Sequence, residues 1–361
     1  MADDKEIVLV TGSAGRVGAA VIKKLGDERR IIGFELMKAL YASANEELVP
    51  CDLSSEESCA QALNHIKNFY GTKIASVIHL AAYYSFTNTS MDLYNKITVE
   101  GTRRLLRGLQ KFEVEQFIFS STMLVHEPCQ VGKKINENSP VNPKWAYPLS
   151  KVLTEKVIHE ERGNIPTVIL RISGVYDDDC HSIPISNQIQ RIYENQVNAH
   201  LFAGNMSHGA DFMHNDDLAD CLIKCVHKRK ELPPELTLLI GEGKTLSYAE
   251  LQDRISNELF GHGIKTYALP KPLCKFGAWF ESMIPFSSNS FILPWMIDLA
   301  DDHYELDISK AKKFLGWEPK HHLADTLPLM IQDLKKNPEA WYKKNGLKMD
   351  KKAIQKVHAK H

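Results

Sequence analysis

Two residues spaced one helical turn apart, Tyr147 and Lys151, form a pair that can exchange a proton. A tyrosine is normally a poor base at neutral pH, because its pKa is about 10. An ammonium group beside the phenol stabilises the phenolate and lowers that pKa. The spacing therefore predicts that Tyr147 gives or takes the proton of a substrate hydroxyl and that Lys151 supports it.

Three hydroxyl side chains lie upstream of this pair, at Ser120, Ser121 and Thr122, where a strand predicted over residues 116–121 ends. A hydroxyl at that end can hydrogen-bond a substrate oxygen and orient it toward Tyr147. Taken singly, Tyr-x-x-x-Lys is common on helix surfaces and Ser-Ser-Thr is common in turns. The order of the motifs along the chain favours a catalytic role for these residues, because a glycine turn and an acidic residue at a strand end precede them.

The glycine turn joins a predicted strand to a predicted helix and reads Thr11-Gly-Ser-Ala-Gly-Arg-Val-Gly18. In this context glycines allow a tight turn, a close backbone approach to pyrophosphate and close helix–strand packing, and the helix N-terminus faces the phosphates. We expect a nicotinamide dinucleotide here, exchanging a hydride with the substrate. Its binding residues would be Gly12, Ser13, Gly15, Arg16, Val17 and Gly18, with Tyr147 and Lys151 at the nicotinamide ribose.

Glu35 lies at the end of the second predicted strand, about 20 residues beyond the turn, where a carboxylate can accept hydrogen bonds from the adenosine ribose. A carboxylate there also repels a 2′-phosphate, so NAD is favoured, although Arg16 and Lys38 leave NADP open. Asp52, followed by Leu53, closes another strand-like segment. Asp52 could hold the adenine edge, or it could equally cap the helix that follows.

Short apolar runs alternate with helical patterns through the first half of the chain, which predicts an α/β fold with a doubly wound, Rossmann-type parallel sheet. The predicted strands span residues 6–11, 31–35, 76–82, 116–121 and 167–172, with a further one at 236–241. The predicted helices span residues 16–25, 56–69, 93–112, 148–160 and 186–195, and a loop is predicted at 177–185.

Domain boundaries follow from this pattern. We expect a dinucleotide-binding domain over residues 1–176, with a contribution from 205–240, and a smaller, mixed substrate-binding region over 177–204 and 241–345. Open parallel sheets bind ligands outside the carboxyl ends of their strands, which places the substrate between the two. Residues 346–361 are basic and poor in apolar side chains, so we expect a disordered tail.

Composition excludes several classes of function. A formal net charge of −1 gives no field that would attract nucleic acid, and no apolar run reaches the roughly 18 residues of a membrane span. The first residues lack the charged start of a signal peptide, so we expect a cytoplasmic protein. The seven cysteines form no C-x-x-C pair, and Cys221 and Cys225 read as core residues, so we expect free thiols and no metal.

The motifs together resemble the extended short-chain dehydrogenase/reductase family, with similarity over nearly the whole chain to about Asn345. The matching segments are the glycine turn, Asp52-Leu53, His79-Leu80-Ala81-Ala82, Ser120-Ser121-Thr122, Tyr147-x-x-x-Lys151, Arg171-x-x-x-Val175-Tyr176, Asp211-Phe212-x-His214-x-Asp216-Asp217 and Leu315-Gly316-Trp317-x-Pro319. The resemblance implies that Tyr147 is the acid/base, Lys151 its partner and Thr122 the third member of a triad. It also implies that Leu80, Ala81 and Ala82 run beneath the cofactor.

Three departures from the family pattern concern the substrate. Thr98 stands where relatives usually have the Asn of a proton relay. Ala210 stands where relatives acting on nucleotide sugars have an Arg that grips the diphosphate, and Gly174 stands where they tend to have Asn. In Gly174-Val175-Tyr176 the chain is similar to the 3β-hydroxysteroid dehydrogenase and dihydroflavonol reductase branches, which handle less polar substrates.

Other features leave alternatives open. His126 could line the active site as a titratable group, or it could be a polar loop residue. The aromatic residues 83–86 could wall an apolar pocket or simply pack. The apolar stripe in 272–286 could dock on a lipid surface or cap the pocket, but a buried helix face is more common.

The favoured function is therefore the NAD(P)-dependent interconversion of a secondary alcohol and a ketone on a small, moderately apolar substrate. The alternative is a nucleotide-sugar epimerase or dehydratase, in which the hydride leaves and returns within one cycle. A non-catalytic dinucleotide sensor is less consistent with an intact Thr122, Tyr147 and Lys151. The resemblance also implies a homodimer formed by the helices at 93–112 and 148–160.

Overall fold

A computed structural model describes residues 5–36, 46–85, 90–274, 294–351 and 354. Its centre is a seven-stranded sheet in the order β12-β8-β7-β5-β1-β2-β3, in which every neighbouring pair is parallel. The strands are β1 (Ile7–Thr11), β2 (Arg30–Glu35), β3 (Glu46–Pro50), β5 (Ser76–His79), β7 (Phe117–Thr122), β8 (Thr167–Ile172) and β12 (Glu235–Ile240). The predicted doubly wound parallel sheet is confirmed.

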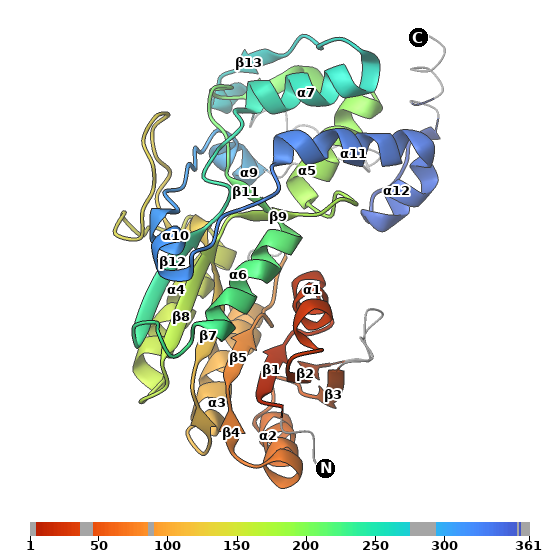
Figure 1. Cartoon of the computed structure of the whole chain (residues 1–361). Coiled ribbons are helices and arrows are strands. Elements are labelled where there is room, and N and C mark those ends of the chain that lie inside the picture. The colour runs from red at the N-terminus through yellow and green to blue at the C-terminus, as the bar shows by residue number, and fades with distance from the viewer. Residues whose placement is uncertain (1–4, 37–45, 86–89, 275–293, 352–353, 355–361) are drawn as a thin grey trace.

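Both faces of the sheet are buried, because alternate residues of each strand point to opposite sides. Val8 and Val10 of β1 pack in one hydrophobic cluster with α1 (Arg16–Leu25) and α6 (Asn215–His227). Ile7 and Leu9 pack in a second cluster, on the other face. The helices of that face are α2 (Glu56–Tyr70), α3 (Glu100–Leu109) and α4 (Ala146–Glu161), seen around the sheet in Figure 1.

The strand order reverses direction between β1 and β5, which lie side by side at the centre of the sheet. Helices that follow the strands on either side of this point diverge, and the crevice they leave at the carboxyl ends is where doubly wound sheets bind ligands. The glycine turn after β1 and the hydroxyl cluster ending β7 both lie at this edge.

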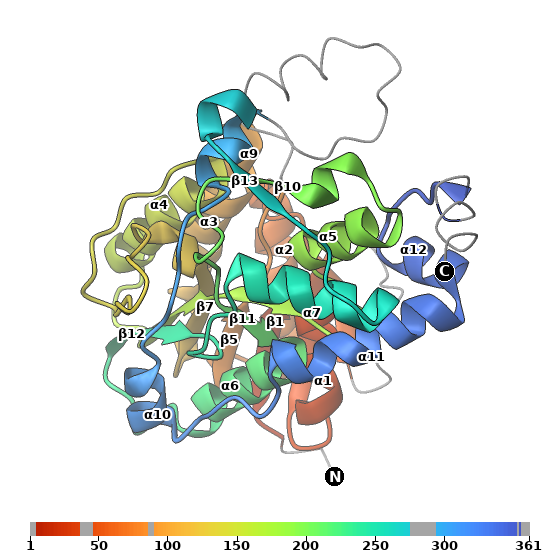
Figure 2. The same ribbon diagram turned by 90° about the horizontal axis from the view of Figure 1, so that it is seen from above.

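A second part of the chain lies over the carboxyl ends of the strands (Figures 1 and 2). Its core is a third cluster made by α5 (Ile183–Tyr193), α7 (Tyr248–Phe260), α11 (Leu323–Lys336) and α12 (Pro338–Lys344). Two short parallel pairs belong here, β9 (Gly174–Tyr176) with β11 (Phe212–His214), and β10 (Leu201–Ala203) with β13 (Tyr267–Leu269). The remaining elements are β4 (Lys73–Ile74), β6 (Glu113–Val114), a π-helix (Tyr94–Val99), two 3-10 turns (Met123–Val125 and Val197–His200), α9 (Pro294–Leu299) and α10 (Ser309–Leu315).

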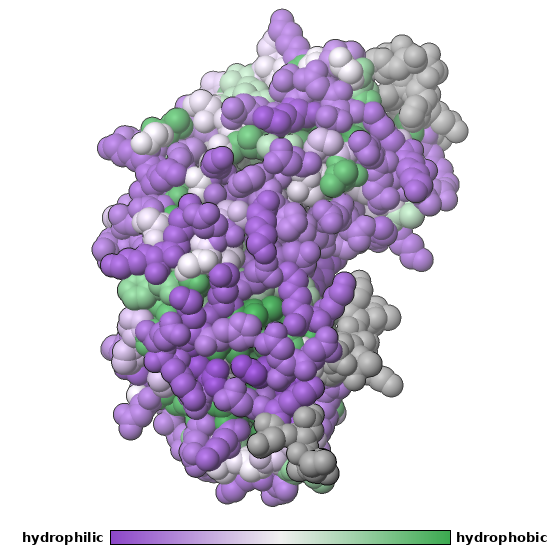
Figure 3. Space-filling model, viewed as in Figure 1, coloured by the Kyte–Doolittle hydropathy of each residue, from purple (hydrophilic) through white to green (hydrophobic). Residues whose placement is uncertain are grey.

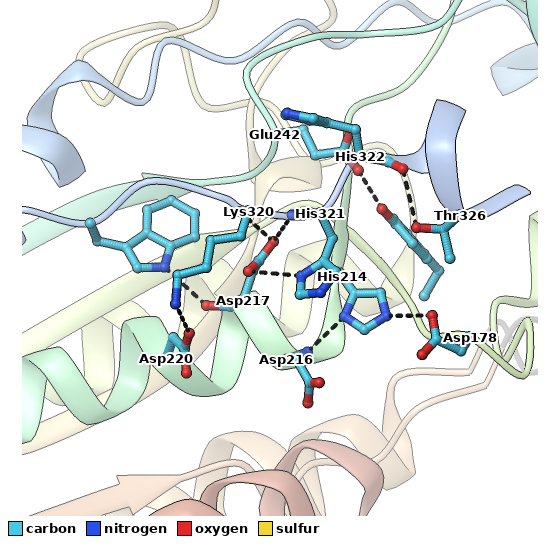
Figure 4. A network of polar contacts seen from close by, with 12 residues as sticks. Asp178, His214, Asp216, Asp217, Asp220, Glu242, Lys320, His321, His322 and Thr326 are labelled. Carbon is cyan, nitrogen blue, oxygen red and sulfur yellow. Dashed lines mark hydrogen bonds and ion pairs between the residues drawn. The ribbon is translucent and has the colours of Figure 1, made fainter.

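Buried hydrogen bonds join the second part to the sheet (Figure 4). The Asp217 carboxylate of α6 accepts from the backbone N–H groups of Lys320 (2.9 Å) and His321 (2.8 Å) and contacts the His321 ring at 3.1 Å. Glu242, just after β12, accepts from the Leu323 N–H at 2.9 Å. The segment entering α11 is thereby tied to the sheet by carboxylates that satisfy its backbone donors.

Two local predictions were wrong. α5 begins at Ile183, inside the segment expected to be a loop, because a proline is tolerated in a first helical turn and Ile185 and Ile189 are buried on one face of the helix. The expected disordered tail is partly ordered, since Leu347 and Met349 pack against the third cluster. Its lysine-rich composition concealed these two apolar anchors.

The surface in Figure 3 is mostly hydrophilic, with hydrophobic residues in small separate areas. Among the described residues, no helix is long and apolar enough to cross a membrane. All seven cysteines are free, and Cys221 and Cys225 are fully buried in the core, as predicted. From residue 275 on, the predicted apolar stripe of 272–286 lies outside the described residues.

Candidate active site

A cavity of about 1520 Å³ lies at the carboxyl ends of the strands and is bordered by residues of both parts of the molecule. Of the predicted cofactor and catalytic residues it brings together Gly12, Gly15, Arg16, Val17, Gly18, Leu80, Ala82, Thr122, Tyr147 and Lys151. Ser13, Glu35, Asp52, Leu53 and Ala81, all of them described, are not among the residues that border it. The glycine turn and the hydroxyl–Tyr–Lys set therefore face one space.

The glycine turn has the shape that a phosphate cradle requires. Gly12 has a φ of +68°, and a Cβ atom there would lie 2.9 Å from the backbone nitrogen of Ala81. At Gly18 a Cβ atom would lie 2.6 Å from the Ser13 carbonyl oxygen, so only glycine lets α1 pack this closely on the turn. The N-terminus of α1 at Arg16 then opens on the cavity, where unpaired N–H groups can bind phosphate.

A buried chain of hydrogen bonds holds the turn against β5. The Thr102 hydroxyl donates to the Thr98 carbonyl (2.6 Å), so it must accept from Nε2 of His79 (2.8 Å). His79 Nδ1 then accepts from the Thr11 hydroxyl at 2.7 Å, and Thr11 Oγ1 accepts from the Ala81 N–H. Burial lowers the pKa of His79 to about 3, which keeps this ring neutral.

The two acidic residues expected near the adenosine come at or just after the ends of neighbouring strands, since Glu35 pairs with Pro50 and the Cys51 N–H donates to the Glu35 carbonyl at 3.1 Å. Glu35 ends β2 half-buried, and its Oε1 accepts from the Leu36 N–H at 2.8 Å. Asp52 accepts from the Ser54 N–H at 2.8 Å, and this bond lowers the pKa of its carboxyl group. Asp52 thus makes a local turn contact, and the capping alternative is wrong, because Ser55 is the N-cap residue of α2 and accepts from the Ser58 N–H.

Tyr147 lies in the first turn of α4, and Thr122 is the last residue of β7. Burial raises the pKa of Tyr147, and a hydrogen bond with the Thr122 side chain opposes that rise. Thr122 is buried, and its hydroxyl also accepts from the Leu124 N–H at 3.3 Å. The Tyr147 phenol and the Thr122 hydroxyl are therefore hydrogen-bonded partners, and both residues border the cavity.

Lys151 lies one turn further along α4 and is only 3% exposed. Its ammonium donates to the Ser120 carbonyl at 2.6 Å and lies 5.8 Å from the centre of the Tyr147 ring. Burial lowers the pKa of Lys151 to about 7, and the Glu155 carboxylate acts in the opposite direction. Lys151 thus lies next to the phenol ring with its charge disfavoured by burial and favoured by the Glu155 carboxylate.

Aromatic side chains surround the Tyr147 ring. Tyr84 packs edge-on against it with ring centres 4.9 Å apart, and Trp145 lies at 5.5 Å. Both border the cavity, so the predicted aromatic segment at 83–86 contributes a wall through Tyr84. Tyr94 of the π-helix lies 6.5 Å from Tyr147 and donates to the Ser85 carbonyl. Such walls suit an apolar substrate body.

His126 does not line the active site, and it lies in the loop segment after the 3-10 turn Met123–Val125. It is fully buried and absent from the cavity lining. Its Nδ1 lies 3.0 Å from the Ser139 carbonyl and so carries the proton, while Nε2 accepts from the Arg171 guanidinium at 3.0 Å. The ring is thus a neutral structural acceptor, and burial lowers its pKa.

The three departures from the family pattern have structural causes or consequences. Thr98 lies in the π-helix, and its hydroxyl accepts from the Tyr83 N–H at 2.9 Å, so it supports the aromatic wall. At Gly174 a Cβ atom would lie 2.6 Å from the Phe212 ring, which fills the space an Asn side chain would need. Ala210 pairs by backbone with Tyr304 and presents a methyl group where an arginine would reach.

Sequence reasoning missed other residues near the site. Lys144 borders the cavity and pairs with Asp302 at 2.9 Å, which links the approach to α4 with the second part. Arg191 on α5 also borders the cavity, and its guanidinium makes no ion pair with any other residue that the structure describes. Neither belongs to a spaced motif, so only the folded arrangement reveals them.

The chain matches the model of the NAD dependent epimerase/dehydratase family over residues 8–241. It is 26% identical over 343 residues to a UDP-glucose 4-epimerase of Halalkalibacterium halodurans, covering 89% of this chain and 92% of that protein. It is 26% identical over 343 residues to the 3 beta-hydroxysteroid dehydrogenase/Delta 5-->4-isomerase of Mycobacterium tuberculosis, covering 90% of each. The solved UDP-glucose 4-epimerase of Thermus thermophilus, a complex with NAD, superposes with a TM-score of 0.68 at 18% identity, covering 92% of this chain and 99% of that chain.

The family match spans well over half of the chain and includes the glycine turn, the hydroxyl cluster and the Tyr–Lys pair. The chain therefore belongs to the NAD dependent epimerase/dehydratase family, as an NAD-dependent enzyme of the extended short-chain dehydrogenase/reductase type.

Proposed function

We propose that the enzyme interconverts a secondary alcohol and a ketone on a largely apolar substrate, with net reduction or oxidation of NAD. The observation that carries this proposal is the Phe212 ring packed on Gly174, which puts hydrocarbon where relatives acting on nucleotide sugars tend to have Asn. Ala210 adds a second apolar position, and Tyr84 and Trp145 wall the space beside Tyr147. The similarity to a steroid dehydrogenase supports the same substrate class.

The proposed roles follow from the contacts. Thr122 holds the substrate oxygen and Tyr147 exchanges its proton, because the two side chains are hydrogen-bonded to each other and both residues border the cavity. Lys151 stabilises the phenolate form of Tyr147, and its contact with the Ser120 carbonyl fixes the ammonium in place. Thr122, Tyr147 and Lys151 are thus the proposed catalytic residues.

The cavity fits NAD, since the open glycine cradle and the free end of α1 border it together with Leu80 and Ala82. Gly12, Ser13, Gly15, Arg16, Val17 and Gly18 would hold the pyrophosphate, Glu35, Asp52 and Leu53 the adenosine, and Leu80, Ala81 and Ala82 the adjoining ring face. When bound, NAD supplies the hydride acceptor and donor. Glu35 favours NAD over NADP, because its carboxylate would repel a 2′-phosphate.

Nucleotide-sugar epimerisation or dehydration is the second candidate. Arg191 favours it, because a cavity-lining guanidinium that makes no ion pair within the described part of the chain could bind a diphosphate. The epimerase relatives support the same reading. In that reaction the cofactor would be oxidised and reduced within each cycle, so no NADH would accumulate.

A substrate panel separates the two candidates. Purified enzyme with NAD would be offered hydroxysteroids, smaller secondary alcohols and UDP-sugars, with NADH absorbance and product epimers both measured. We expect NADH to accumulate with an apolar alcohol. Epimer formation from a UDP-sugar without NADH would transfer the assignment to the second candidate.

The cellular setting is also a proposal. A cytoplasmic enzyme is consistent with a chain whose described helices include none able to cross a membrane. A homodimer through α3 and α4 is supported by Leu149, an apolar side chain of α4 that is 37% exposed. Sedimentation of the purified protein would test the dimer directly.

A further inference from the structure

Lys151 carries its charge in a place that disfavours it. The groups nearest its ammonium are the Ser120 carbonyl, the Phe119 ring at 4.8 Å and the Tyr147 ring, none of which is an anion when the phenol is protonated. His79 of β5 is close enough for the Lys151 charge to lower its pKa, and it is neutral. An anion nearby is therefore needed to keep a buried ammonium protonated.

Glu155 supplies that anion from the same helix, one turn beyond Lys151. Its carboxylate is 12% exposed, and Arg171 of β8 engages both oxygens, from Nε at 3.1 Å and from Nη2 at 2.7 Å. The Ser121 hydroxyl of β7 donates to Oε1 at 2.5 Å. Side chains of two neighbouring strands, β7 and β8, thus hold the Glu155 carboxylate of α4 in place.

Arg171 is itself held in place by acceptors outside the ion pair. Its Nη1 donates to Nε2 of the neutral His126 ring and to the Glu137 carbonyl at 3.4 Å. All three guanidinium nitrogens of Arg171 make hydrogen bonds. A rotation of Glu155 away from Arg171 would therefore leave a buried arginine unpaired. His126, which does not reach the cavity, therefore has a defined role in this network.

We propose that Glu155 is a positioning residue of the reaction, held by Arg171 and Ser121 so that its charge keeps Lys151 protonated and sets the pH at which Tyr147 can act as a base. The proposal rests on the proposed function of Tyr147 and deepens it. Charged and titratable groups near the Tyr147–Lys151 pair are Glu155 on α4, Tyr84 after β5, Tyr94 on the π-helix, His79 on β5 and, through Glu155, Arg171 on β8.

Glu155→Gln tests the proposal, because it removes the charge while keeping the size of the side chain. Without the nearby anion Lys151 should lose its proton at lower pH, and a neutral Lys151 no longer stabilises the Tyr147 phenolate. We therefore expect the rising limb of kcat/KM for alcohol oxidation to move up by about one pH unit. Glu155→Asp keeps the charge, so the rising limb of its kcat/KM should lie closer to the wild-type pH.

Glu161→Gln is the matched control, because Glu161 is also a glutamate of α4 that engages two arginines, Arg103 at 2.6 Å and Arg107 at 2.7 Å. Glu161 does not border the cavity, so the rising limb of kcat/KM in Glu161→Gln should stay at the wild-type pH. A purely structural role for Glu155 would lower the rate or the melting temperature without moving the limb. That outcome would overturn the proposal.

A second readout does not depend on any substrate. The ultraviolet phenolate signal of Tyr147, taken as the difference between each enzyme and its Tyr147→Phe version with NAD present, should appear at higher pH in Glu155→Gln. A shift here without alcohol turnover would retain the role of Glu155 and reject the proposed function. If Glu155→Gln does not fold, Glu155→Gln/Arg171→Met removes the orphaned cation as well, and an unshifted phenolate signal in it would reject the role of Glu155.

Discussion

At the scale of single residues, Glu35 is the side chain on which cofactor choice depends. Its carboxylate ends β2 half-buried, and the Leu36 N–H holds one of its oxygens. Glu35→Ser should weaken NAD binding by about tenfold, the value of one charge-assisted hydrogen bond, and should strengthen NADP binding. Fluorescence titration with both nucleotides measures this, with the exposed Glu28→Gln as control. Unchanged discrimination in Glu35→Ser would show that Glu35 does not face the ribose.

His79 is the residue that couples stability to pH. Its folded pKa of about 3 lies below the value of about 6.5 in an unfolded chain, so unfolding takes up a proton as the pH falls between these values. The stability that the neutral ring contributes is therefore present above pH 6.5 and is lost as the pH falls. His79→Gln should be less stable at neutral pH, but the wild type should lose about 2 kcal/mol more than the variant between about pH 6.5 and 5.

Denaturant unfolding at a series of pH values gives both curves. The exposed His262→Gln is the control, because a solvated histidine should not change the pH slope. Parallel curves for His79→Gln and the wild type would mean that folding does not lower the pKa of His79, contrary to its burial and its hydrogen bonds with Thr11 and Thr102.

At the scale of elements, the packing of α1 on the glycine turn decides whether the cradle forms. An added Cβ at Gly18 meets backbone atoms of Ser13 and Gly12, which cannot move independently of β1. Gly18→Ala should therefore displace α1 and reduce NAD affinity at least tenfold. Gly108→Ala in α3 is the matched control, because its Cβ meets the movable end of Leu63 and alanine favours a helix by about 1 kcal/mol. Equal NAD affinity in the two variants would contradict the assigned role of the turn.

The helices and strands that could be predicted from the sequence are those with a strong periodicity of apolar residues. β8 and α1 begin and end at the predicted residues, because their apolar patterns stop at clear turn residues. The short strands β9, β10, β11 and β13 were not predicted, since three residues carry too little pattern to stand out from a loop. Helix α5 was placed three residues late, because its proline suggested a loop.

At the scale of the whole molecule, motif spacing predicted many of the residues that border the cavity, although Glu35, Asp52 and three others do not border it, and it did not predict what surrounds them. Tyr147, Lys151 and Thr122 follow strands and helices whose ends are fixed by the parallel sheet, so their meeting was predictable. The Lys144–Asp302 pair and the Arg171–His126 contact join residues 158 and 45 positions apart, and no local pattern encodes such distances. The substrate half of the cavity therefore needed the structure.

The central claim is that Tyr147 exchanges the proton of the substrate hydroxyl, and Tyr147→Phe tests it most directly. The variant keeps the aromatic ring between Tyr84 and Trp145 and removes only the phenol oxygen. NADH formation from the alcohol identified in the substrate panel should fall by at least about 100-fold, while NAD affinity stays within about twofold of the wild type. Turnover at the wild-type rate in Tyr147→Phe would contradict the account.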